Sequence, residues 1–119
     1  MIATLLGLAG LMGVFGVIVS AAAAHGAPES GLGNAGAMLL FHAAALVGGT
    51  AALHAGLFWR PLGLAALCGF ALGAALFAGD IAARAYLGHR LFPMAAPTGG
   101  SILIAGWLAL ALAALVPAR

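Results

Sequence analysis

Four long apolar runs, separated by short stretches rich in turn-forming residues, dominate the pattern of hydrophobic and polar positions. A helix needs about 20 apolar residues to cross the hydrocarbon core of a bilayer. The runs cover residues 2–24, 35–58, 62–87 and 101–116. Because short connections make neighbouring helices antiparallel, the pattern predicts an all-α fold, an integral membrane antiparallel four-helix bundle.

The connections carry residues that stop helices. Pro28 lies in the first, Trp59-Arg60-Pro61 forms the second, and the third runs from Gly88 to Gly100. Residues 21–24, at the end of the first run, resemble a signal-peptide cleavage site, but no positively charged segment precedes the run, so we expect it to be retained as a helix. The uniform composition predicts a single transmembrane domain, residues 1–119.

Composition supports a bilayer as the surroundings of the chain. Of its 119 residues, 66% are hydrophobic and only 5% are charged, which is too little charge to solvate a soluble domain. Four arginines against two acidic residues give a net charge of +2, too sparse for a nucleic-acid surface. Cys68, the only cysteine, lies within an apolar run and is expected to be a small buried hydrophobic residue.

Small residues recur at helical spacing in each run. In the third run they include Ala66, Gly69 and Gly73, and in the fourth run they include Ser101, Ala105, Ala109 and Ala113. Such stripes let helix backbones approach closely inside a membrane, where the hydrophobic effect does not drive helices together. The stripes are therefore expected to face neighbouring helices.

Asp80 is one of only two acidic residues, and it lies inside the third apolar run with Arg84 one helical turn later. A charge at this depth suggests a functional site. Asp80 and Arg84 continue the small-residue face of their helix, and His42 continues that of the second helix. Together with His25 at the end of the first helix, they predict a polar intramembrane cluster in one half of the bilayer.

Three interpretations of this cluster remain open. In the first, Asp80 and Arg84 form a structural ion pair. In the second, Asp80 and a histidine form a proton or small-ligand site. In the third, His25, His42 and either Asp80 or His89 bind a metal, although no HxxxH or HExxH spacing places ligands on one helix face.

No sequence motif indicates a catalytic residue or a cofactor. The chain contains no nucleophile elbow, phosphate-binding loop, dinucleotide fingerprint or CxxC. We therefore expect no catalytic group, no cofactor and no metal, with His25 and His42 as the first candidates if a metal is bound. The Pro97, Gly99 and Gly100 loop motif could bind an anion at the start of the fourth helix, or could simply form a helix-entry turn.

Several short stretches, spread over the whole chain, resemble the Domain of Unknown Function 423 family of small bacterial membrane proteins. They are Ala24-His25-Gly26, Phe41-His42, Phe77-Ala78-Gly79, Pro97-Thr98-Gly99-Gly100 and Ala105-Gly106-Trp107. The resemblance implies a multi-pass protein of the bacterial inner membrane with four spans and cytoplasmic termini. It supplies no activity, and it favours the two histidines and the Pro97–Gly100 turn as shared features over Asp80, whose position resembles a small polar residue in some relatives.

These observations favour a non-enzymatic accessory or interaction component, which contacts the lipid bilayer and a larger membrane complex or a second copy of itself. A small proton-coupled transporter and a membrane metal-binding protein are the alternatives. Orientation rests on the resemblance alone, because each side of the membrane is expected to hold two arginines, Arg60 and Arg119 on one and Arg84 and Arg90 on the other.

Overall fold

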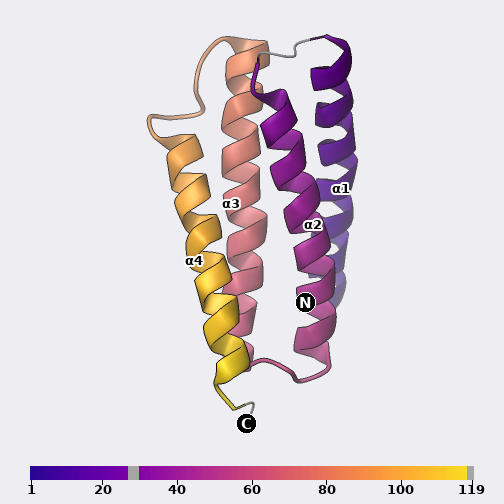
Figure 1. Cartoon of the computed structure of the whole chain (residues 1–119), viewed down its shortest axis with the longest axis vertical. Coiled ribbons are helices and arrows are strands. Elements are labelled where there is room, and N and C mark those ends of the chain that lie inside the picture. Colours follow the sequence, from indigo (N-terminus) through magenta and orange to yellow (C-terminus); the bar gives the residue numbers. More distant parts are fainter. Residues whose placement is uncertain (27–29, 118–119) are drawn as a thin grey trace.

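The computed structural model describes residues 1–26 and 30–117, which form four helices (Figure 1). The helices are α1 (Ile2–His25), α2 (Leu32–His54), α3 (Arg60–Leu87) and α4 (Ala95–Leu115). All four are long and apolar enough to cross a membrane. The described part of the chain contains no strand, so the predicted all-α fold is confirmed.

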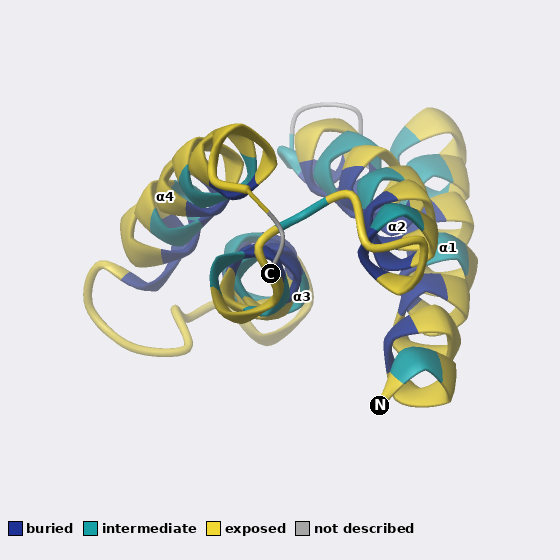
Figure 2. Ribbon diagram, turned by 90° about the horizontal axis from the view of Figure 1, so that it is seen from below, coloured by how far each residue is buried: buried dark blue, intermediate teal, exposed yellow. Residues whose placement is uncertain are grey.

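Successive helices run antiparallel to each other, and the main contacts join helices that are consecutive in the chain. Within the described residues, no Cα atom of α4 lies within 8 Å of a Cα atom of α1 or α2. Seen along the helices, α2 and α4 both lie beside α3, and α1 lies beyond α2 (Figure 2). The bundle is therefore open, with its two outer helices apart, and measures 49 × 26 × 19 Å.

Helices α2 and α3 lie at the centre of this arrangement and carry its most deeply buried side chains. Leu67 and Phe70 are fully buried, whereas large apolar side chains such as Phe15 of α1 and Ile104 of α4 are exposed. An apolar outer surface is stable in a lipid environment and not in water. The burial pattern thus agrees with the composition: the helices face one another along narrow seams and face lipid elsewhere.

Glycines make the closest helix contacts. A Cβ atom on Gly99 of α4 would lie 2.6 Å from the backbone nitrogen of Phe77, and one on Gly73 of α3 would lie 2.8 Å from the carbonyl oxygen of Gly99. In the other half of the molecule, a Cβ atom on Gly36 of α2 would collide with Ser20 Oγ of α1. The predicted small-residue face of the third helix is therefore a packing face.

The predicted face of the fourth helix is wrong in the first half of the helix, although Ala113 of the predicted stripe is buried. Ser101 and Ala105 are exposed, and the buried side of α4 carries Gly99, Leu103 and Gly106 instead. Both stripes contain small residues at helical spacing, but only glycine lets the α3 backbone come this close. The sequence pattern did not distinguish the alanine stripe from the glycine stripe.

Three helix boundaries differ from the predicted runs by three residues or more. Helix α2 ends at His54 rather than at residue 58. Helix α2 begins at Leu32, which is completely buried, and α4 begins at Ala95 rather than at residue 101. Pro97 thus lies in the first turn of α4, where its missing N–H costs no intrahelical hydrogen bond. The proposed loop motif Pro97–Gly100 is therefore helical. The expected turn residues Pro28 and Glu29, and Arg119, lie outside the described residues.

Cys68 is exposed, contrary to expectation. It lies on the outer stripe of α3 with Ala65 and Leu72, which are also exposed. These residues recur at helical spacing on the side turned away from the neighbouring helices. In a bilayer this stripe contacts lipid, so an apolar position in a membrane helix need not be buried in protein.

Candidate functional site

Asp80 is buried on α3, with 1% of its surface exposed, and both of its carboxylate oxygens are engaged. The Nε atom of Arg84, one turn later, lies 3.4 Å from Oδ2. The backbone N–H of Leu91 donates a hydrogen bond of 3.0 Å to Oδ1. The expected ion pair is present, and the same carboxylate anchors the connection between α3 and α4.

His42 forms the main polar link between α2 and α4. One ring nitrogen, Nδ1, lies 2.8 Å from the carbonyl oxygen of Met38. The other, Nε2, accepts a hydrogen bond of 3.1 Å from the indole Nε1–H of Trp107. An indole nitrogen can only donate and a carbonyl can only accept. The geometry therefore requires a neutral imidazole that carries its proton on Nδ1.

Phe70 of α3 completes an aromatic cluster with these two side chains. Its ring centroid lies 5.4 Å from that of His42 and 4.6 Å from that of Trp107, with tilted ring planes. Such tilted contacts are favourable between aromatic rings. Because the backbones of α2 and α4 do not pack against each other, this cluster holds the two helices at a fixed distance.

The structure does not gather the predicted polar residues into one site. His25 is exposed at the end of α1. His42 lies ten residues into α2, about 15 Å from its start and near its midpoint. His42 thus lies deeper in its helix than the apolar run indicated, because α2 begins earlier than that run. Within residues 1–26 and 30–117, no three metal-ligating side chains are grouped.

A polar cavity of about 310 Å³ lies between the end of α3 and the start of α4. Its lining includes Asp80 and Arg84 of α3, Arg90 of the connection, and Pro97 and Gly100 of α4. The sequence indicated the two α4 residues as an anion-binding feature but did not associate Arg90 with them. The α3–α4 connection folds back toward Asp80, and this brings Arg90 near the helix ends.

Trp107 was also missed as a polar partner. In a membrane interior an indole N–H requires an acceptor, and His42 was the only candidate at a comparable depth on a neighbouring helix. The pair could therefore have been proposed from sequence had the depth of His42 been estimated correctly.

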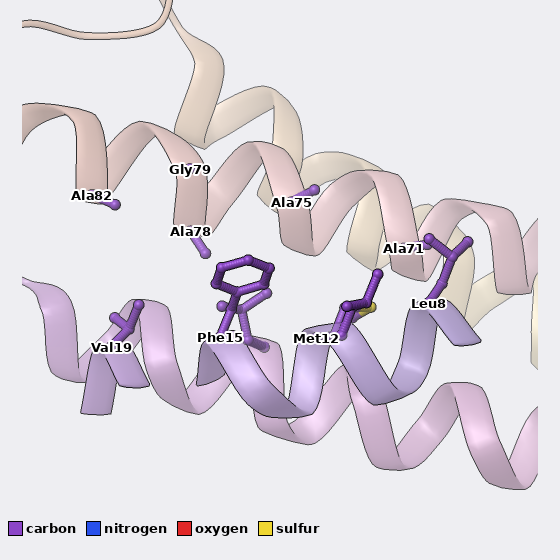
Figure 3. Close-up of a pocket in the computed structure, with 11 residues that line it drawn as sticks. Leu8, Met12, Phe15, Val19, Ala71, Ala75, Ala78, Gly79 and Ala82 are labelled. Atoms are coloured by element: carbon purple, nitrogen blue, oxygen red, sulfur yellow. The ribbon is translucent and has the colours of Figure 1, made fainter. Parts of the chain in front are cut away.

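An apolar groove of about 290 Å³ lies between α1 and α3 (Figure 3). Phe15 and Met12 of α1 point toward α3 across this groove, and Ala75, Ala78 and Gly79 line its other side. The two helices barely contact each other directly, and small side chains on α3 leave the space open. The groove contains almost no polar surface, so it can accept only an apolar occupant.

The fold and its surface define a multi-pass membrane protein with four spans. The family described as "Protein of unknown function (DUF423)" matches residues 19–100, more than half of the chain. The chain therefore belongs to this family, as its resemblance indicated. No curated protein and no solved structure matches it.

Proposed function

We propose that the protein is a non-enzymatic interaction component of the bacterial inner membrane, with both termini in the cytoplasm, that packs against a larger membrane complex. The supporting observation is that the two buried titratable side chains, His42 and Asp80, already have partners inside the molecule. Both nitrogens of His42 and both oxygens of Asp80 hold helices or connections in place. These groups therefore serve the architecture, which is what a scaffold requires.

The same contacts argue against a proton-coupled carrier. Exchange of a proton at His42 Nε2 would place an imidazole N–H against the indole N–H of Trp107, so that two donors would face each other. Protonation would thus break the link between α2 and α4. Asp80 lies about 10 Å of helix from the end of α3, and its two oxygens are engaged by Arg84 and by the Leu91 N–H.

The groove between α1 and α3 is the proposed contact for a transmembrane helix of the partner. Ala71, Ala75 and Gly79 form a small-residue row on α3 that α1 does not cover. In membranes such rows are where helix backbones approach most closely. A second copy of the chain is the alternative occupant of this groove. The mass of the purified assembly distinguishes a homo-oligomer from a complex with another protein.

Purification in a mild detergent tests this proposal. We expect a stoichiometric protein partner that is retained by Ala65→Leu, on the outer stripe of α3, and lost with Ala75→Leu, which fills the groove. If a second copy of this chain occupies the groove instead, the purified protein will be a homo-oligomer that contains no other protein. Proton-coupled flux by the purified protein in liposomes, abolished by His42→Ala, would overturn the proposal in favour of a carrier.

The proposed orientation has its own test. Reporter fusions after Gly33 and Pro93 should be periplasmic, and a fusion after Arg60 should be cytoplasmic. A periplasmic reading after Arg60 would reverse the orientation without affecting the proposed partner contact.

A further inference from the structure

The cavity beside Arg84 and Arg90 adjoins an apolar cavity deeper in the molecule. Phe77 and Gly100 line both. The second cavity, of about 300 Å³, extends between α2 and α4 past Leu103 and Ile104 to Trp107. The seven residues from Gly100 to Trp107 correspond to about 10 Å of helix. One groove thus runs from a basic mouth to an apolar floor.

The groove exists because α2 and α4 do not pack against each other. The His42–Trp107 hydrogen bond closes its inner end and keeps the two helices apart. Gly100 keeps it open on the α4 side, since a Cβ atom there would meet only Phe77, at 4.0 Å. Each of the two connected volumes is at the lower end of the range for small-molecule sites, about 300–1,000 Å³.

The mouth of the groove carries uncompensated positive charge. Among residues 1–26 and 30–117, Asp80 is the only acidic residue that lines it, and its oxygens are engaged by Arg84 Nε and the Leu91 N–H. Among the described residues, the terminal Nη groups of Arg84 and the guanidinium of Arg90 have no hydrogen-bond or ion-pair partner. The positive end of the α4 dipole adds to this field.

The mouth also lies at the depth of lipid headgroups. Arg84 is three residues from the end of α3, about 5 Å, and Arg90 lies in the connection beyond it. Guanidinium groups bind phosphate strongly and with defined geometry. Basic pockets between transmembrane helices at this level are suited to anionic headgroups.

We propose that this groove binds one anionic phospholipid, with its phosphate between Arg84 and Arg90 and an acyl chain between α2 and α4. The basic mouth and the apolar floor match the two ends of such a molecule in charge and polarity. The site lies on the α2–α4 side of α3 and is separate from the α1–α3 groove proposed for a protein partner.

Native mass spectrometry of the protein from bilayers of equal phosphatidylglycerol and phosphatidylcholine tests the site. We expect one retained phosphatidylglycerol, favoured severalfold over phosphatidylcholine. Arg90→Gln should abolish this preference, whereas Arg60→Gln, at the opposite membrane surface, should leave it unchanged. Arg90 is exposed, and its guanidinium has no hydrogen bond or ion pair within the described residues, so we expect this variant to keep the fold.

A second pair of variants tests the apolar part of the groove. Gly100→Leu should fill it and reduce the retained lipid several-fold, whereas Gly48→Leu, which also enters open space on a helix, should have no effect. Equal phosphatidylglycerol retention by Arg90→Gln and Arg60→Gln would overturn the proposal. So would displacement by millimolar inorganic phosphate together with insensitivity to Gly100→Leu, because that result indicates a site for free phosphate.

Discussion

The two helical hairpins of this protein are built differently. Within the described residues, no side-chain hydrogen bond or ion pair joins α1 to α2, and their contact consists of apolar side chains and the close approach of Gly36 to Ser20. The α3–α4 hairpin has an equally close glycine contact, but it also has the Asp80 anchor, and α4 is joined to α2 through His42 and Trp107.

The difference teaches what polar groups contribute in this membrane fold. Close packing of small residues is sufficient to hold two neighbouring helices together, as α1 and α2 demonstrate. Polar contacts occur where packing is absent, across the gap between α2 and α4 and along the seven-residue connection from Gly88 to Met94. They fix distances and orientations that apolar contacts alone would leave undefined.

The largest expected effect tests the glycine contact between α3 and α4. Gly99→Ala places a Cβ atom against backbone atoms of Phe77 and Gly73, which cannot rotate away, and should lower the free energy of unfolding by about 2–3 kcal/mol. Gly36→Ala should cost less in the α1–α2 hairpin, because the Ser20 hydroxyl can move and the backbone atoms that the Cβ would meet lie at 3.0 Å, farther than at Gly99. Gly10→Ala, which meets no atom within 4 Å, is the control. Thermal denaturation in detergent measures all three, and equal losses from Gly99→Ala and Gly10→Ala would refute the contact.

The next effect concerns the Asp80–Arg84 pair, which has no counterpart in the α1–α2 hairpin. Arg84→Ala leaves a buried carboxylate without its cation and should cost about 2 kcal/mol, less than in a fully buried pair because the Arg84 side chain is 43% exposed. Asp80→Ala should cost less, since the Arg84 side chain is 43% exposed and can reach the interface, although the Leu91 anchor is lost. The double variant should lose less than the sum of the two single losses. Simple additivity in this cycle would mean that the pair is not coupled.

Much of the fold could be predicted from the sequence. The four apolar runs indicate the four helices because length and hydrophobicity dominate in a membrane. The ends of the helices do not follow from the runs. Leu32 begins α2 within a turn-rich segment because the bundle buries its side chain. Ala95 begins α4 two residues before Pro97. Burial and position within the first turn depend on tertiary structure, which the local pattern does not encode.

The candidate site was only partly predictable. The i,i+4 spacing of Asp80 and Arg84 places them together in any helix, so this pair follows from sequence. The contacts of Leu91 and Trp107 connect residues that are 11 and 65 positions apart from their partners, and they depend on how the connection and α4 pack. The roles predicted for His25, His42 and the Pro97–Gly100 turn stay predictions.

A smaller effect is expected at the link between α2 and α4. Trp107→Phe removes the indole N–H but keeps a ring beside Phe70, so His42 Nε2 loses its donor and stability should fall by about 1 kcal/mol. Trp59→Phe is the matched control, because the Trp59 side chain has no hydrogen bond and its backbone N–H to Ala113 is kept. An equal loss from the two variants would show that the hydrogen bond contributes nothing beyond ring packing.

The smallest predicted effect has the opposite sign. Thr50 of α2 is completely buried, and its hydroxyl has no hydrogen-bond partner among the described residues. A buried hydroxyl without a partner is unfavourable by about 1–3 kcal/mol, and valine has nearly the same shape. Thr50→Val should therefore raise the free energy of unfolding by about 1 kcal/mol, whereas Thr98→Val, at an exposed position on α4, should not. A loss of stability on Thr50→Val would mean that this hydroxyl is bonded in the folded protein, and that α2 has a polar contact in its second half as well as at His42.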